Sequence, residues 1–247
     1  MKKYLCVLLT AVILSAGSIK FFGGPEEAVN ENFKPVFDIN SHMLDNIMEY
    51  GDEYCVGYIS TSKDPDRHRQ TLNKLRELSD EICEGADTDL EKVQKIEYWV
   101  ADNLYYNYDA AETSVTAEVI SLENVLETKT ATCAGYSNLF SALCNMQGIY
   151  CVNLRGGTYI KEYAPDNLLS VPMNHEWNAV RIDGEWLFID TTWLSNNQYR
   201  DGEYIRSETM DTQYTDMDFE YMSYEHRIDL ADYRDFASSI NYFEQEN

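Results

Sequence analysis

Residues 174–193 read NHEWNAVRIDGEWLFIDTTW, and this stretch decides the fold. Apolar and aromatic residues fill both sides of Asp183-Gly184, the dipeptide most favoured in a two-residue hairpin turn. We therefore predict two antiparallel strands. Such a turn places Ile182 opposite Glu185, and this pairing fixes the register of the whole hairpin.

The register brings a histidine close to an aspartate. With Ile182 opposite Glu185, Asp190 lies diagonally across from His175 on the same face, and diagonal neighbours roughly 7–8 Å apart are within side-chain reach. That face also carries Trp177, Ala179, Trp186 and Phe188, whereas Val180, Ile182, Leu187 and Ile189 lie on the other. An aspartate among aromatic rings needs a donor such as the imidazole N–H, which then fixes the histidine tautomer. The alternative is a structural core histidine beside an aspartate at a strand end.

A helix is expected upstream, from Cys133 to Gln147, with Gly148 as its stop signal. Its apolar residues recur at spacings of three and four: Tyr136, Leu139, Phe140, Leu143 and Met146. Thr130 or Thr132 can cap this helix, which places Cys133 in the first turn, where unpaired N–H groups and the helix dipole stabilise a thiolate. Taken alone, a cysteine at this place is more often a small buried apolar residue than a nucleophile.

The rest of the chain gives weaker patterns. We expect a linker over about 22–50, a helix that starts at Asp64-Pro65 and stops at Glu84-Gly85, a helix after the capping box Thr88–Glu91, one or two short helices over 115–126, and a strand over 149–154 ended by Gly156-Gly157.

Composition restricts the partners. The chain has 247 residues, with 19 Lys plus Arg against 43 Asp plus Glu, a net charge of −24. This charge repels phosphate backbones, so nucleic acid is not expected as a partner. The sequence has no C-x-x-C pair and only scattered histidines, so neither a metal nor another cofactor is expected.

The N-terminus suggests a compartment. Lys2 and Lys3 precede an apolar run from Tyr4 to Ile19, as in a secretory signal. Whether this segment is cleaved or stays as a membrane anchor, the body of the chain is expected to be secreted or at the cell surface. Five cysteines remain after Cys6, namely Cys55, Cys83, Cys133, Cys144 and Cys151, and an odd number leaves at least one thiol unpaired or paired between molecules. A disulfide that involves Cys133 stays an open alternative.

Three blocks in order resemble the transglutaminase-like superfamily, whose fold is related to that of papain. They are Ala131–Ser137 leading to Gly148-Ile149, Asn174–Val180, and Gly184–Trp193. The resemblance covers about residues 90–193. Ala131 departs from it, because many relatives have glycine there. The stretch from Phe219 to His226 is similar to a later segment of some bacterial relatives, too weakly to assign roles.

The resemblance implies an α+β, papain-like transglutaminase-core fold, with the nucleophile helix packed on an antiparallel sheet and helices N-terminal to it. It makes Cys133 the nucleophile, His175 the general base and Asp190 the residue that orients that base. The implied chemistry is acyl transfer on protein or peptide amides through a thioester. Water would complete hydrolysis, as in a peptidase or amidase, and an amine would complete transamidation. A catalytically idle peptide-binding module is the alternative from another class.

Further assignments follow from position. The Cys133 backbone N–H is the first oxyanion donor, and Tyr106 and Trp177 are candidates for a second donor or a substrate contact, with Asn103 and Tyr105 as further candidates. Each of these side chains could be structural instead. Proteins of the cell envelope are candidate substrates, and the acidic surface favours neutral or basic ones. The expected organisation is a signal or anchor over 1–24, a linker and N-terminal extension over 25–61, the catalytic core over 62–195, and an acidic extension packing on the core over 196–247.

Overall fold

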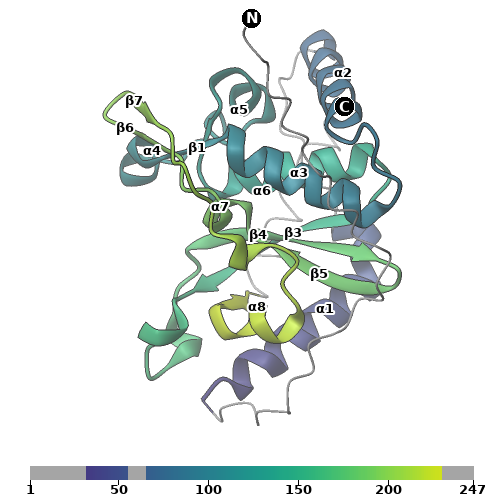
Figure 1. Ribbon diagram of the computed structural model, residues 1–247. Coiled ribbons are helices and arrows are strands. Elements are labelled where there is room, and N and C mark those ends of the chain that lie inside the picture. The colour runs from purple at the N-terminus through teal and green to yellow at the C-terminus, as the bar shows by residue number, and fades with distance from the viewer. Residues whose placement is uncertain (1–31, 55–64, 230–247) are drawn as a thin grey trace, which may run out of the picture.

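An antiparallel sheet forms the middle layer of the protein, with strands in the order β5-β4-β3-β8 (Figure 1). The strands are β3 (Cys151–Thr158), β4 (His175–Ile182), β5 (Glu185–Ile189) and β8 (His226–Ile228). The structure is a computed structural model that describes residues 32–54 and 65–229. The predicted signal or anchor over 1–24 therefore lies outside the described residues.

The β4–β5 hairpin has the predicted register. Ile182 pairs with Glu185 and Asn178 pairs with Ile189. Asp183 and Gly184 have φ values of 51° and 86°, the left-handed conformations that a two-residue type I′ turn requires. The second strand is shorter than expected, because β5 ends at Ile189. Asp190 therefore leaves the sheet instead of continuing the ladder opposite β4.

A layer of helices covers the upper face of the sheet in Figure 1. It consists of α2 (Pro65–Ile82), α3 (Asp89–Asn103), α5 (Leu122–Thr128) and α6 (Cys133–Met146). The predicted capping box starts α3, where the Thr88 side chain accepts from the Glu91 N–H and the Glu91 side chain accepts from the Thr88 N–H. The predicted apolar face of the hairpin packs against these helices, with Val180 and Ile189 fully buried.

Buried polar side chains fix α6 on the sheet. Ser137 Oγ donates to the Trp177 carbonyl (3.1 Å), and Asn178 Nδ2 donates to the Ser137 carbonyl (3.1 Å) and to Asn153 Oδ1 (2.9 Å). Asn153 Nδ2 in turn donates to Asn138 Oδ1 (2.6 Å). These directional bonds set the position of α6 relative to β4 more narrowly than apolar packing alone would. The first residues of α6 and β4 are Cys133 and His175.

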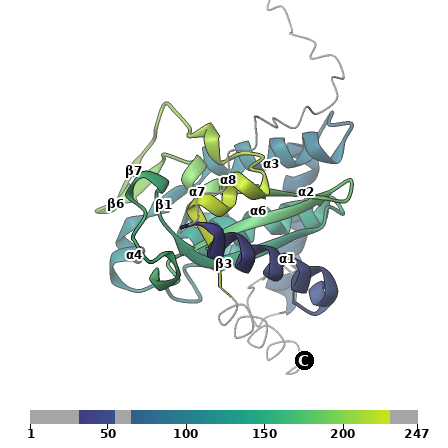
Figure 2. The ribbon, with the colours of Figure 1, turned by 90° about the horizontal axis from the view of Figure 1, so that it is seen from below.

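Two helices, α1 (Lys34–Tyr54) and α8 (Phe219–Glu225), cover the opposite face of the sheet (Figure 2). The linker predicted for this N-terminal region is therefore wrong over Lys34–Tyr54. The buried stripe of α1 consists of Val36, Asn40, Met43, Leu44 and Ile47. The polar residue in the middle of that stripe hides the apolar period from sequence inspection.

Strand β3 runs through the glycine pair that was expected to end it. Gly156 pairs with His175 on one side and with Ile228 on the other. A Cβ atom on Gly156 would lie 1.8 Å from the Arg227 carbonyl oxygen. Glycine is therefore required for the close approach of β8, and it does not act as a strand terminator here.

A second, smaller sheet has the order β2-β1-β6-β7. Its strands are β1 (Tyr105–Asn107), β2 (Thr130–Ala131), β6 (Gln198–Arg200) and β7 (Glu203–Ile205), and β1 leads into α4 (Tyr108–Thr113). Three short 3₁₀ turns cover Lys161–Tyr163, Leu168–Ser170 and Thr212–Tyr214, and α7 covers Thr191–Leu194. Within the described ranges, no helix combines the length and the apolar character needed to span a bilayer.

The close approach at Gly156 predicts a strong effect of one methyl group. Gly156→Ala should lower the free energy of unfolding by about 3 kcal/mol, at the upper end of overpacking effects, because β8 must move away from β3. Gly157→Ala is the matched control, since its Cβ would lie 3.0 Å from the Val171 carbonyl oxygen and should cause a smaller loss. Urea unfolding measures both variants. Equal losses would contradict the assigned role of Gly156.

Candidate active site

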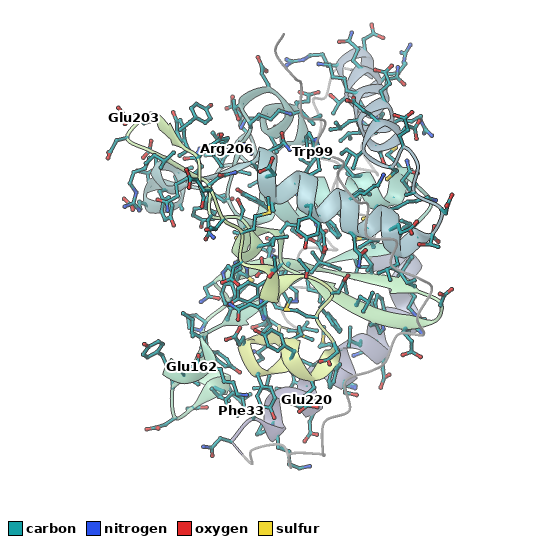
Figure 3. All side chains as sticks on the ribbon, in the orientation of Figure 1. Phe33, Trp99, Glu162, Glu203, Arg206 and Glu220 are labelled. Atoms are coloured by element: carbon teal, nitrogen blue, oxygen red, sulfur yellow. The ribbon has the colours of Figure 1, made fainter. Side chains whose placement is uncertain are left out.

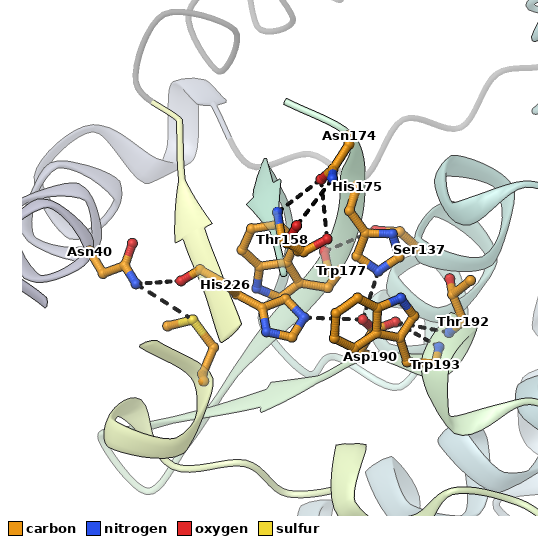
Figure 4. Close-up of polar contacts among 11 residues, drawn as sticks. Asn40, Ser137, Thr158, Asn174, His175, Trp177, Asp190, Thr192, Trp193 and His226 are labelled. Atoms are coloured by element: carbon orange, nitrogen blue, oxygen red, sulfur yellow. Dashed lines mark hydrogen bonds and ion pairs between the residues drawn. The ribbon is translucent and has the colours of Figure 1, made fainter. Parts of the chain in front are cut away.

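His175 and Asp190 meet at the end of the hairpin. His175 is the first residue of β4, and Asp190 is the N-cap of α7. His175 Nε2 lies 2.7 Å from Asp190 Oδ2 (Figure 4). The two side chains are 7% and 0% exposed, so this is a hydrogen bond shielded from water. The bond occupies Nε2 and leaves Nδ1 as the ring nitrogen available to Cys133.

The Asp190 carboxylate accepts four N–H groups. Oδ1 accepts from the backbone N–H groups of Thr192 (3.1 Å) and Trp193 (3.0 Å). Oδ2 accepts from His175 Nε2 and from His226 Nε2, at 2.7 and 3.2 Å. Burial alone would raise the pKa of Asp190, but the charge and hydrogen bonds of His175 and His226 outweigh it and hold this pKa well below its usual range. Asp190 is therefore a fixed anion.

Cys133 begins α6, as predicted. Thr132 is the N-cap residue, although its side chain makes no capping hydrogen bond, and Thr130 instead accepts from Asn107. The Cys133 thiol is half-buried and free. Cys83, Cys144 and Cys151 are also free thiols in the described chain but are buried, and Cys55 lies outside the described residues.

Cys133 lies close enough to His175 to influence the pKa of the imidazole. Burial lowers the pKa of His175, whereas the charge and hydrogen bond of Asp190 and the hydrogen bond and charge of Cys133 raise it, to about 10. The structure thus brings together all three residues of the predicted triad. A histidine placed between a carboxylate and a thiol can hold a proton for the thiolate and later transfer it.

Two tryptophan rings lie nearly parallel to the His175 ring. The Trp193 ring is 5.2 Å away at 27°, and the Trp177 ring is 6.2 Å away at 14°. Trp177 is only 1% exposed, so the structure does not bring it to a surface that a substrate could reach. It packs behind His175, contrary to its candidate role as a substrate contact.

A cleft of about 480 Å³ opens beside His175. It is lined by Tyr106, Tyr108, Ile160, His175, Thr192, Trp193, Ser195, Asn196, Asn197, Gln198 and Tyr214. Of the four side chains predicted as a second oxyanion donor or substrate contact, only Tyr106 lines this cleft. Burial, followed by the nearby Cys133 and Tyr108, raises the pKa of Tyr106 to about 12. Asn103 instead donates to the Trp99 carbonyl (2.9 Å), and the Tyr105 ring packs against that of Tyr204.

No role was predicted from sequence for His226, although it ends the Phe219–His226 stretch that resembles a segment of some bacterial relatives. This residue starts β8 and is fully buried, with its Nε2 on the same carboxylate oxygen as that of His175. Its place depends on the pairing of Thr158 with His226, a contact between segments far apart in the chain. The signal in the sequence was limited to the weak resemblance of the Phe219–His226 stretch, and this resemblance does not specify a partner for the histidine.

Among the described residues, His175, Asp190 and His226 form the one set whose ligand atoms lie close enough to hold a metal ion. The 2.7 and 3.2 Å separations between those atoms are ordinary hydrogen-bond distances. Each nitrogen already points at the carboxylate oxygen. We therefore assign the set to a hydrogen-bond network.

Residues 76–191 match the family model of the transglutaminase-like superfamily. Over 121 residues the chain is 31% identical to the kyphoscoliosis peptidases of Mus musculus and Homo sapiens, which is 49% of this chain but 18% of each relative. The chain thus spans under a fifth of these relatives. A crystal structure of a TGase shares 22% identity at a TM-score of 0.42, over 70% of this chain and 43% of the other. For the periplasmic domain of TgpA from Pseudomonas aeruginosa, the identity is 16% and the TM-score 0.37, over 53% and 49%.

The His175–Asp190 contact predicts a pH-dependent stability. Because the pKa of His175 rises from 6.5 to about 10, its contribution to the free energy of unfolding is complete below pH 6.5 and is lost as the pH approaches 10. The Asp190 pKa is depressed from 3.8, so its contribution is lost as the solution becomes more acidic than that. The difference in melting temperature between wild type and Asp190→Asn should therefore be largest at about pH 5–6.5.

Asp218→Asn is the control for this experiment, because Asp218 is an exposed aspartate that caps α8. Its difference from wild type should lack the maximum. A flat difference for Asp190→Asn between pH 5 and pH 10 would contradict an ionised pair, and thermal scans across this range decide it.

Proposed function

Because residues 76–191 belong to the transglutaminase-like superfamily, we propose that this chain is a thiol acyl-transfer enzyme that hydrolyses amide bonds in proteins or peptides. One observation carries the proposal. His175 donates through Nε2 to the buried carboxylate of Asp190, and Cys133 lies close enough to His175 to influence its pKa. A nucleophile, a base and a residue that orients the base are the parts that acyl transfer through a thioester requires.

In the proposed reaction, the Cys133 thiolate attacks the amide carbonyl carbon, and the carbonyl oxygen becomes an oxyanion. Protonated His175 transfers its Nδ1 proton to the leaving amine as the C–N bond breaks, which leaves a thioester on Cys133. Water then attacks the thioester, with His175 accepting its proton. The products are a carboxylic acid and the regenerated thiolate–imidazolium pair.

Two groups are proposed to stabilise the oxyanion. The Cys133 N–H lies in the first turn of α6, where no intrahelical acceptor is available. The Tyr106 side chain lines the cleft and lies near enough to Cys133 for the thiol to influence its pKa. Because that pKa is about 12, the hydroxyl keeps its proton at neutral pH and can donate a hydrogen bond to an oxyanion.

Water is proposed as the acceptor for two reasons. Five of the residues that line the cleft beside His175 are polar and uncharged, namely Thr192, Ser195, Asn196, Asn197 and Gln198, and such a surface retains water. The mouse and human relatives are, by name, peptidases. Transamidation by an amine acceptor is the second outcome that the experiment below distinguishes.

The proposed substrates are neutral or basic polypeptides outside the cytoplasm. Apart from His175 itself, the residues that line the cleft carry no charge. Two projecting arms, the β6–β7 hairpin and the 3₁₀ turn Lys161–Tyr163, carry Glu203 and Glu162 (Figure 3). The chain as a whole has a net charge of −24. The location is proposed from the basic and apolar N-terminal segment that begins at Lys2.

The proposed nucleophile should react faster than the other thiols. Iodoacetamide at neutral pH should alkylate Cys133 at least about 100-fold faster than Cys144, and His175→Ala should remove most of this advantage, on the scale of general-base contributions. Peptide mass mapping measures each site. Equal, slow labelling of Cys133 and Cys144 would reject the enzyme and favour an idle peptide-binding module.

Incubation with a glutamine-containing protein and a labelled amine then identifies the reaction. Peptide hydrolysis would produce new N-termini, hydrolysis of side-chain amides would release ammonia, and transamidation would attach the label. Cys133→Ala should abolish all three. Predominant attachment of the label would overturn the choice of water as acceptor.

Electrostatic attraction of substrates predicts a salt effect. Between low and physiological salt, kcat/KM for a Lys-rich peptide should fall about threefold, because ions screen the acidic surface. A neutral peptide of the same length should change little. The double variant Glu162→Gln/Glu203→Gln should reduce the salt effect for the basic peptide, and an unchanged salt dependence would exclude these two arms as its source.

A further inference from the structure

His226 lies beyond the segment over which the family match extends, yet it contacts the centre of the site. We propose that His226 is a positioning residue, which holds the Asp190 carboxylate in place and limits how strongly Asp190 binds the His175 proton. This inference rests on the proposed function, since it describes a fourth residue of the same machinery.

The geometry identifies the proton that His226 uses. Its Nε2 lies 3.2 Å from Asp190 Oδ2, the oxygen that His175 Nε2 contacts at 2.7 Å. An ionised carboxylate can only accept hydrogen bonds, so both nitrogens must donate. His226 therefore carries a proton on Nε2, and one oxygen atom is shared between two imidazoles (Figure 4).

The His226 ring is held from several sides. It contacts the Trp177 ring at 4.8 Å and the Trp193 ring at 4.9 Å, the same two tryptophans that lie along His175. Behind it, Asn40 Nδ2 of α1 donates to the His226 carbonyl (2.8 Å), and Asn40 Oδ1 accepts from the Ile228 N–H (2.7 Å). The donor is thus fixed in direction before any substrate arrives.

Packing alone does not account for a histidine at this place. The residue is 0% exposed, and its Nδ1 makes no hydrogen bond within the part of the chain that the structure describes. A buried acceptor without a partner is unfavourable, and an apolar ring of similar size would avoid this penalty. The Nε2–Asp190 bond is the interaction that compensates.

The shared oxygen has a chemical consequence. Each N–H that Asp190 accepts neutralises part of its charge, so fewer donors would leave more charge to attract the His175 proton. A histidine that holds its proton too firmly is a poor acid toward the leaving amine. The other titratable or charged groups that face His175 or line the cleft beside it are Cys133 of α6, Glu176 of β4 with its partner Arg155 of β3, Tyr106 of β1, Tyr108 of α4 and Tyr214. They stay unchanged when His226 is replaced.

The test compares His226→Phe, which removes the donor, with His226→Gln, whose amide can restore it. In His226→Phe, the alkaline limb of the pH profile of kcat, which reports the loss of the His175 proton, should move up by about one pH unit, and kcat at neutral pH should fall about tenfold with little change in KM, since one pKa unit corresponds to a factor of ten. His226→Gln should recover both values most of the way to wild type.

Met222→Ala is the stability control. Met222 is fully buried in α8, next to β8, and its truncation should lower the melting temperature while the pH profile keeps the wild-type limb. Should His226→Phe not fold, His226→Asn takes its place, because its shorter side chain does not reach Asp190. An upward shift of the alkaline limb of the pH profile in His226→Asn then supports the positioning role of His226, and an alkaline limb at the wild-type pH overturns it.

Several outcomes would overturn the inference: a wild-type limb in His226→Phe, an equal shift in Met222→Ala, or no recovery in a folded His226→Gln. These outcomes are distinct from failure of the proposed function. If Cys133 of the wild type reacts no faster than Cys144, the proposed enzyme and the role of His226 are both rejected. If wild type reacts fast and His175→Ala slowly, while the His226 variants match wild type, only the role of His226 is lost.

Discussion

The bond between His175 Nε2 and Asp190 Oδ2 forms where β5 stops and α7 starts, and the site is organised around it. The two-residue turn aligns the strands so that Asp190 arrives near the start of β4. Asp190 then leaves the ladder, and its side chain caps α7. One carboxylate thereby starts a helix with Oδ1 and orients an imidazole with Oδ2, and neither role leaves it free to rotate.

The layers around the sheet deliver the remaining groups from opposite sides. Helix α6 brings Cys133 from one face and is held there by amide and hydroxyl side chains on α6, β3 and β4. Strand β8 brings His226 and is secured by Asn40 of α1 on the other face. The geometry of the candidate site therefore depends on polar contacts that fix two layers against the sheet, and apolar packing supplies the bulk of the core around them.

The elements that could be predicted from the sequence are those whose determinants are local. Asp183-Gly184 specified the hairpin register, the capping box specified the start of α3, and helical spacing placed Cys133 in the first turn of α6. Residues whose role depends on a partner far away in the chain could not be predicted. Gly156 was expected to end β3, whereas in the structure it allows β8 to approach β3 closely. Asn40 broke the apolar stripe of α1 because its partners, His226 and Ile228, lie near the other end of the described chain.

The position of β8 at the edge of the main sheet also orders events in time. During synthesis, the residues from Cys133 to Trp193 emerge well before His226, so the carboxylate at first lacks one of its four donors. The strand that supplies it can pair only after β3 and the nearby Asn40 are in place. A nascent chain thus contains Cys133, His175 and Asp190 before the hydrogen bonds to Asp190 are complete, and the candidate site is finished only when the last strand of the sheet has paired.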